Sequence, residues 1–102
     1  MARASTIEEM VAAAKTPADH KAIASYYYDQ AKTVEDKAAD HSKLAEQYIK
    51  ESESSPSYYY RGDSDALHCE KISTLYNELG AEYQALAKDH QELAEKIATA
   101  QH

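Results

Sequence analysis

The sequence predicts an all-α protein, and three observations lead to that prediction. Ala, Glu, Lys, Leu and Gln, which favour helices, dominate the 102 residues, and only two glycines and two prolines are available for turns. Apolar residues recur at helical spacing over two long segments. These segments also repeat each other at a shift of 49 residues. Two similar helices joined by one polar break are expected to form a helical hairpin.

A short helix is expected first, over about residues 6–14. Its start has a capping-box pattern that fits either Ser5 with Glu8 or Thr6 with Glu9. A break then separates this helix from the rest of the chain. The expected organisation is therefore a short N-terminal helix within residues 1–15 and a hairpin domain over residues 16–102.

The first long helix is predicted to begin at Pro17 and to end near residue 51. Thr16 is a good N-cap, Pro17 suits the first helical position, and Asp19 places an acid in the first turn. An apolar stripe then recurs at helical spacing, and its members are His20, Ile23, Ala24, Tyr27, Ala31, Val34, Ala38, His41, Leu44, Ala45 and Tyr48.

The second long helix follows a polar break at residues 51–57 and ends near residue 100. Its start is open between Pro56 and the Asp63–Ser64 pair. Gly80 lies inside it at a cost of about 1 kcal/mol relative to Ala, so close packing by a neighbour would account for it. The expected stripe consists of Cys69, Ile72, Tyr76, Leu79, Tyr83, Leu86, His90, Leu93 and Ile97.

One such hairpin has too small a cross-section to bury its own apolar stripes well. The chain has no Trp and no Phe, and its core would consist largely of Ala and a few larger aliphatic side chains. Small chains with thin cores often complete them by oligomerising. We therefore expect a homodimer in which two hairpins form a four-helix bundle.

A motif that occurs four times places metal-ligand side chains on these stripes. Asp-His-x-x-(Ile/Leu)-Ala occurs three times, and a degenerate fourth copy has the only cysteine at the histidine position. The separations of 21, 28 and 21 residues are multiples of seven, so each position returns to nearly the same helix face. The recurring residues are His20, His41, Cys69 and His90.

One antiparallel register brings these residues together in pairs. The residue numbers of His20 and His90 sum to 110, as do those of His41 and Cys69, and the turn would then centre on Ser55. The two pairs would lie about 31 Å apart at ~1.5 Å per residue.

The same register faces Tyr27 with Tyr83 and Val34 with Tyr76. An alternative is the layering of many antiparallel coiled coils, which staggers each pair by about half a heptad.

Imidazole and thiolate side chains together favour a transition metal, and cysteine shifts the preference towards Cu(I) or Zn(II). We predict a metal-binding protein, copper first and zinc as the alternative, that serves storage, sensing or electron transfer. The ligands would be His20, His41, Cys69 and His90, with His68 as an extra donor. Two alternatives stay open: haem held non-covalently between facing histidines, and a cofactor-free dimerisation module with polar core layers.

Other classes of function fit less well. The formal net charge of −7 disfavours nucleic-acid binding, which needs clustered Lys and Arg. No apolar run approaches the roughly 20 residues of a membrane span. We do not expect an enzyme, because Asp65-x-x-His68 has no mate for a di-metal carboxylate site and no substrate-pocket feature accompanies the Cys69 thiol.

Five distinctive segments follow one another along the chain: Thr16-Pro17-Ala18-Asp19-His20, Tyr26-Tyr27-Tyr28, His41, His68-Cys69 and His90. Their order resembles that in a group of small exported bacterial helical proteins. The resemblance covers residues 16–97 and implies a removed signal peptide and a periplasmic setting, but no particular activity. The start Met1–Ser5 agrees with a new start placed on a mature exported chain.

Overall fold

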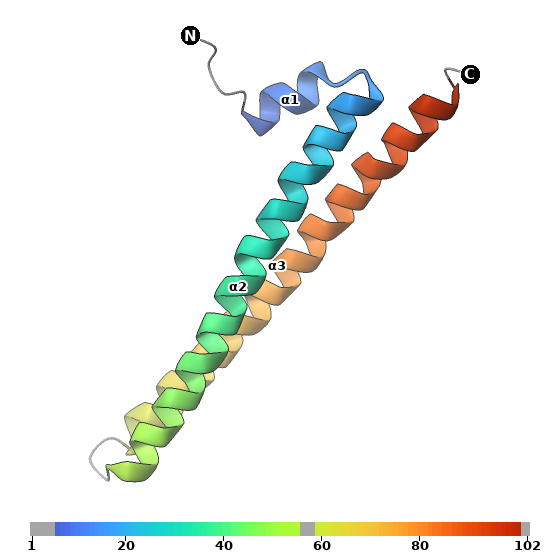
Figure 1. The fold of residues 1–102 in the computed structure, drawn as a ribbon. Coiled ribbons are helices and arrows are strands. Elements are labelled where there is room, and N and C mark those ends of the chain that lie inside the picture. The colour runs from blue at the N-terminus through green and yellow to red at the C-terminus, as the bar shows by residue number, and fades with distance from the viewer. Residues whose placement is uncertain (1–5, 56–58, 101–102) are drawn as a thin grey trace. The chain divides into compact units, whose positions relative to one another are not determined.

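The computed structural model describes residues 6–55 and 59–100, and of Tyr59 and Tyr60 only the backbone. None of these residues forms a strand. α2 and α3 run beside each other as a hairpin (Figure 1). The predicted all-α class and the hairpin are therefore confirmed. The three helices are α1 (Ile7–Ala13), α2 (Pro17–Ser54) and α3 (Tyr59–Ala100).

Thr6 caps α1. Its hydroxyl oxygen accepts a hydrogen bond from the backbone N–H of Glu9 at 3.2 Å. This is the second of the two expected capping patterns, whereas Ser5 lies outside the described residues. The cap satisfies one of the N–H groups that a helix start leaves unpaired.

A reciprocal capping box starts α2, with Pro17 as its first residue. The Thr16 hydroxyl accepts from the backbone N–H of Asp19 at 3.1 Å. In return, the Asp19 carboxylate accepts from the backbone N–H groups of Lys15 at 2.9 Å and Thr16 at 3.1 Å. These bonds to the charged form hold the pKa of Asp19 below its usual 3.8. The Asp19 carboxylate is therefore engaged in the cap.

The turn between the long helices is shorter than expected. α2 continues to Ser54, and α3 begins at Tyr59, between the two expected starts. The expected start at Pro56 lies outside the described residues.

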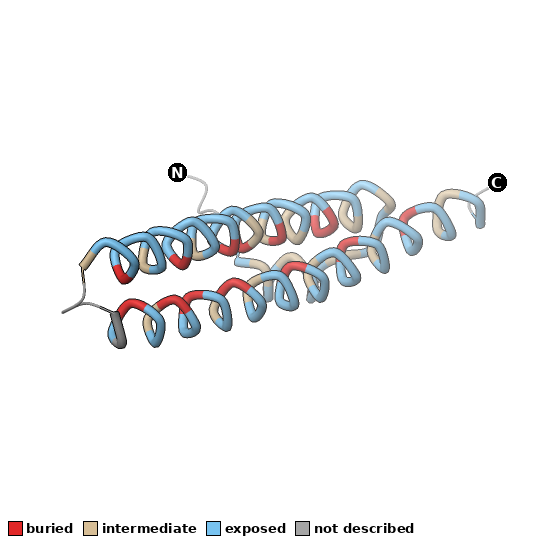
Figure 2. The backbone as a smooth tube through the Cα atoms, turned by 90° about the horizontal axis from the view of Figure 1, so that it is seen from below, coloured by how far each residue is buried: buried red, intermediate tan, exposed pale blue. Residues whose placement is uncertain are grey.

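The chain divides into two compact units. One consists of Met1–Ala31 and Ala81–His102, and the other of Lys32–Gly80. In each unit, buried positions recur along the helices (Figure 2). Within the described residues, no helix is long and apolar enough to cross a membrane.

Small side chains form the centre of the packing in both units. They recur every seven residues, and all of them are buried. A Cβ atom added to Gly80 would lie 3.1 Å from the Cγ atom of Glu35 and 3.5 Å from Val34 Cγ2, which supports the predicted close neighbour at this glycine. The series consists of Ala24, Ala31, Ala38, Ala45 and Ser52 on α2, and Ala66, Ser73, Gly80, Ala87 and Ala94 on α3.

The expected stripes are wrong at four leucines for this reason, whereas their other members are buried or half-buried. Leu44, Leu79, Leu86 and Leu93 are 40–45 % exposed, and within the described part of the chain only Ile23 among the large side chains is fully buried. Each of these leucines immediately precedes a buried small residue, so it lies one helical step to the side of the packed line. Helices that meet through Ala, Ser and Gly leave no room between them for Leu.

Candidate functional site

His20 and His90 form the tightest contact between predicted ligand residues. His20 lies in the first turns of α2 and His90 near the end of α3, and both belong to the unit that contains α1. Their Nδ1 atoms are 3.0 Å apart, and the rings stack with centroids 5.3 Å apart at 18°. Both side chains are half-buried. The antiparallel register in which facing residue numbers sum to 110 predicts that His20 faces His90, and the structure has this contact.

Hydrogen bonding limits the protonation of this pair. An Nδ1-to-Nδ1 hydrogen bond needs one N–H donor and one free lone pair, so the two facing nitrogens hold one proton between them. Burial lowers the pKa of His90 below 6.5, and the nearby His20 lowers it further, whereas Asp89 opposes the shift. His90 is therefore neutral at pH 7.

Tyrosine rings fix the orientation of this pair. The Tyr27 ring stacks on His90, with centroids 6.1 Å apart at 23°, and on Tyr83, with centroids 6.1 Å apart at 25°. Tyr26 packs edge-on against Tyr27 at 5.4 Å. The predicted facing of Tyr27 with Tyr83 is also present. The role of Tyr27 as a support for an imidazole was not foreseen, although its place seven residues after His20 was a usable signal.

His41 lies in the Lys32–Gly80 unit and contacts Tyr76. The two rings stack with centroids 5.8 Å apart at 24°, and the Lys37 ammonium nitrogen lies 5.9 Å from the centre of the Tyr76 ring. The Nδ1 atom of His41 is buried and has no hydrogen-bond partner among the described residues. One polar atom of this unit is therefore desolvated without compensation.

Cys69 lies in a small apolar cluster. It is 8 % exposed and packs in a group with Ala45 and Ala66, against which Tyr48 is also packed. Cys69 thus shares its layer with Ala45 of α2. This agrees with the alternative in which each ligand pair is staggered by about half a heptad. His68, next to it, points to solvent as an exposed residue.

The two predicted ligand pairs therefore differ in the structure: His20 contacts His90, whereas His41 stacks on Tyr76 and Cys69 packs with Ala45 and Ala66. Among the residues that the structure describes, no group of three or more His, Cys, Asp or Glu side chains is placed to hold a metal ion. His20 and His90 instead offer a site with two donors, which would need further ligands from water or from a second chain.

A polar layer that sequence reasoning missed lies in the Lys32–Gly80 unit. The buried Ser73 hydroxyl donates to the carbonyl oxygen of Ala38 at 2.9 Å, and it is 2.9 Å from the Ser42 hydroxyl. The signal was available, because Ser73 stands in the degenerate motif copy where the other copies have Ala. Such a layer can hold the register of the two helices.

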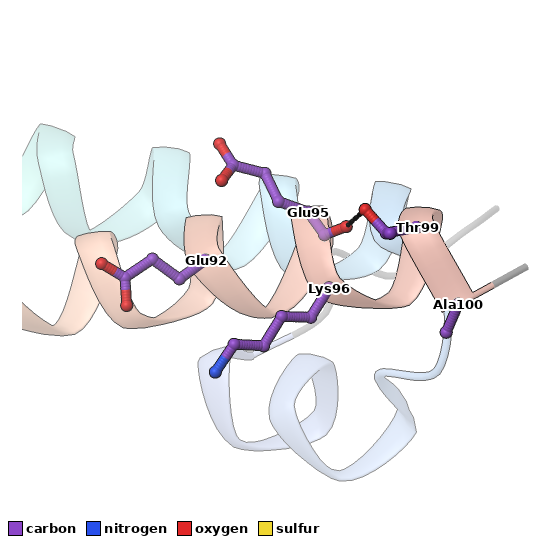
Figure 3. Close-up of a pocket in the computed structure, with 5 residues that line it drawn as sticks. All are labelled: Glu92, Glu95, Lys96, Thr99 and Ala100. Atoms are coloured by element: carbon purple, nitrogen blue, oxygen red, sulfur yellow. Dashed lines mark hydrogen bonds between the residues drawn. The ribbon is translucent and has the colours of Figure 1, made fainter.

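A surface hollow near the end of α3 has no features of a catalytic site. The side chains of Glu92, Glu95 and Lys96 point in different directions (Figure 3). The Thr99 hydroxyl is engaged with the carbonyl oxygen of Glu95 at 2.9 Å. The lining residues are Glu92, Glu95, Lys96, Thr99 and Ala100, none of which is a predicted ligand.

Comparison of the chain with protein families, curated proteins and solved structures finds no match. The chemistry of the His20/His90 pair is therefore the basis for assigning a function.

Proposed function

We propose that this chain binds a transition metal, copper first, and that His20 and His90 are the anchoring ligands. The observation that carries the proposal is the 3.0 Å separation of their Nδ1 atoms. Two imidazole nitrogens on one copper or zinc ion, each at about 2.0–2.1 Å, lie roughly 2.8–3.4 Å apart in square-planar or tetrahedral geometry. The pair therefore has the spacing of two ligands on one ion before any ion is bound.

The protonation state of the pair supports the same proposal. A metal ion needs the unprotonated imidazole, so protons compete with it for the ligand. Because burial lowers the pKa of His90, this competition is weak at neutral pH. Stacking on Tyr27 also restricts the rotation of the His90 ring, which lowers the entropy cost of binding.

The donor set decides the choice of metal. Imidazole suits copper and zinc, and divalent copper is bound most tightly along the first-row series. The Cys69 thiol packs among Ala45 and Ala66 in the other unit. The anchoring pair therefore lacks the thiolate that would favour Cu(I), and Cu(II) is its preferred ion. A site of this kind suits metal storage or sensing.

We also propose that two copies of the hairpin associate as a four-helix bundle. The support is the distribution of side chains: small residues are buried within each unit, while large aliphatic residues remain exposed. Burial of these residues in a dimer would give the assembly the apolar core that a single hairpin lacks.

A cofactor-free dimerisation module is the second candidate. It is favoured by the Nδ1-to-Nδ1 hydrogen bond, which already satisfies both facing nitrogens without a metal. Haem has less support, because a macrocycle between these histidines would have to separate two rings that stack directly on each other.

The test is metal titration of chelator-treated, tag-free protein, with Cu(II) and Zn(II) followed by calorimetry. The variants are His20→Phe and His90→Phe, which keep an aromatic ring but remove the ligand. His68→Gln is the matched control, because it removes an exposed histidine outside the pair. Circular dichroism confirms that each variant is helical.

Near-stoichiometric Cu(II) binding to the native chain is expected, with affinity reduced about tenfold or more in both Phe variants, as is typical when a metal site loses supporting groups. The control should bind like the native chain. Native protein that takes up neither ion at micromolar concentration, or Phe variants that bind as well as the control, would overturn the proposal in favour of the cofactor-free module.

A further inference from the structure

In the Lys32–Gly80 unit, the leucines are exposed and small side chains are buried, which is the opposite of a usual hydrophobic core. Leu67 and Leu75 are 58 % and 62 % exposed, and Leu44 and Leu79 are 45 % and 41 % exposed. The buried positions are held by Val34, Cys69 and small residues. Small units bury only a modest fraction of their surface on folding and are correspondingly marginal in stability.

Leu75 and Leu79 are exposed on α3, and the half-buried Ile72 shares their helix face. We name the residues Leu44, Ile72, Leu75 and Leu79 the apolar edge. The three on α3 are spaced by three and four residues, which is the spacing of a second coiled-coil seam beside the buried one. Two other exposed aliphatic residues of the unit, Ile49 and Leu67, lie outside the apolar edge and line a separate surface hollow.

We infer that the apolar edge is the surface on which a second copy of this chain docks, with α3 antiparallel to the α3 of that copy and a two-fold axis close to Leu75. This names the contact surface of the proposed assembly and does not depend on metal binding. In this arrangement Ile72 lies opposite Leu79 of the second copy, and Leu75 lies close to its own equivalent. An interface of this kind is self-complementary, as two-fold symmetry requires.

Charge complementarity favours a second copy in this orientation. Lys71 and Glu78 are exposed and flank the α3 part of the apolar edge at a spacing of seven residues. Antiparallel pairing about Leu75 places Lys71 of each copy opposite Glu78 of the other. The axis therefore produces two equivalent ion pairs, which specify orientation in coiled coils. Parallel pairing would place these residues opposite like charges.

The chain exposes more surface than a compact protein of its mass. The chain exposes 7568 Å², whereas a compact monomer of 11.4 kDa exposes about 5,800 Å². The excess of about 1,800 Å² is larger than the ~800 Å² that each partner contributes to a standard interface. The chain thus has surface to bury in a dimer.

The first test measures the dimer dissociation constant by sedimentation equilibrium in the presence of chelator. Leu79→Gln is compared with Ile49→Gln, because these residues are exposed to a similar extent, 41 % and 37 %, but Ile49 lies outside the apolar edge. A dimeric native chain is expected, with a dissociation constant raised roughly tenfold or more by Leu79→Gln and unchanged by Ile49→Gln.

The second test uses charge exchange, which leaves the apolar residues in place and keeps the fold. Lys71→Glu and Glu78→Lys should each weaken the dimer, and the double variant should restore it. A native chain that is monomeric at its highest soluble concentration would overturn the inference. So would a double variant that dimerises no better than either single one, or an Ile49→Gln effect equal to that of Leu79→Gln. Because chelator is present throughout, failure of metal binding would leave these results unchanged.

Discussion

Replacement of His41 by phenylalanine should stabilise the protein. The His41 ring stacks on Tyr76, and Phe can keep this contact because its ring has a similar shape. The Nδ1 atom of His41 is buried without a partner among the described residues, and Phe has no polar atom there. The substitution therefore removes a desolvated polar group and retains the packing.

The size of the effect follows from this one atom. A buried polar group without a hydrogen bond costs about 1–3 kcal/mol. His41 is only half-buried. Replacement by Phe also removes the second ring nitrogen together with its hydration. Both points reduce the expected gain, so the lower end of this range applies. A gain of about 1 kcal/mol raises the melting temperature of a small domain by roughly 4–8 °C.

The assay is thermal unfolding followed by circular dichroism at 222 nm, a standard helix wavelength, at one fixed protein concentration because an oligomer melts at a concentration-dependent temperature. His68→Phe is the control: it makes the same substitution at an exposed neighbour of Cys69 and should change stability by less than about 0.5 kcal/mol. A His41→Phe protein that melts below the native chain would refute the reasoning, because it would show that Nδ1 has a stabilising partner in solution.

Three further predictions concern the caps, the packing and the histidine pair. Thr16→Ala should cost about 1 kcal/mol in denaturant unfolding, since it removes an N-cap; no loss would mean that the cap is not formed. Gly80→Leu should destabilise the protein by roughly 1–3 kcal/mol, because the added side chain meets Glu35, and an unchanged denaturation midpoint would show that the helices can separate there freely. Since the pKa of His90 is lowered, the unfolded chain takes up a proton at higher pH than the folded chain. Stability should therefore be full above about pH 6.5 and fall as the pH drops below it, and this acid loss should be smaller in His90→Phe; an equal loss in both proteins would contradict the assignment.

The sequence by itself determined the helices and one of the ligand pairs. Composition and helical spacing were sufficient for three helices, and Thr16 and Pro17 marked the start of α2. The spacing of His20 and His90 predicted their contact, because long side chains on antiparallel helices reach across the packed line. These features depend on local propensity and on helix periodicity, which are properties of the sequence.

Only the tertiary structure decided that the leucines of the expected stripes are exposed. Leu79 was expected on the buried stripe, and close packing by a neighbour was expected at the adjacent Gly80. The helices approach closely through small residues, which keeps Gly80 inside as expected but leaves Leu79 exposed. The same packing put Cys69 against Ala45 and His41 against Tyr76. The distance between two helices is a collective result of all their facing side chains, and no single position in the sequence specifies it.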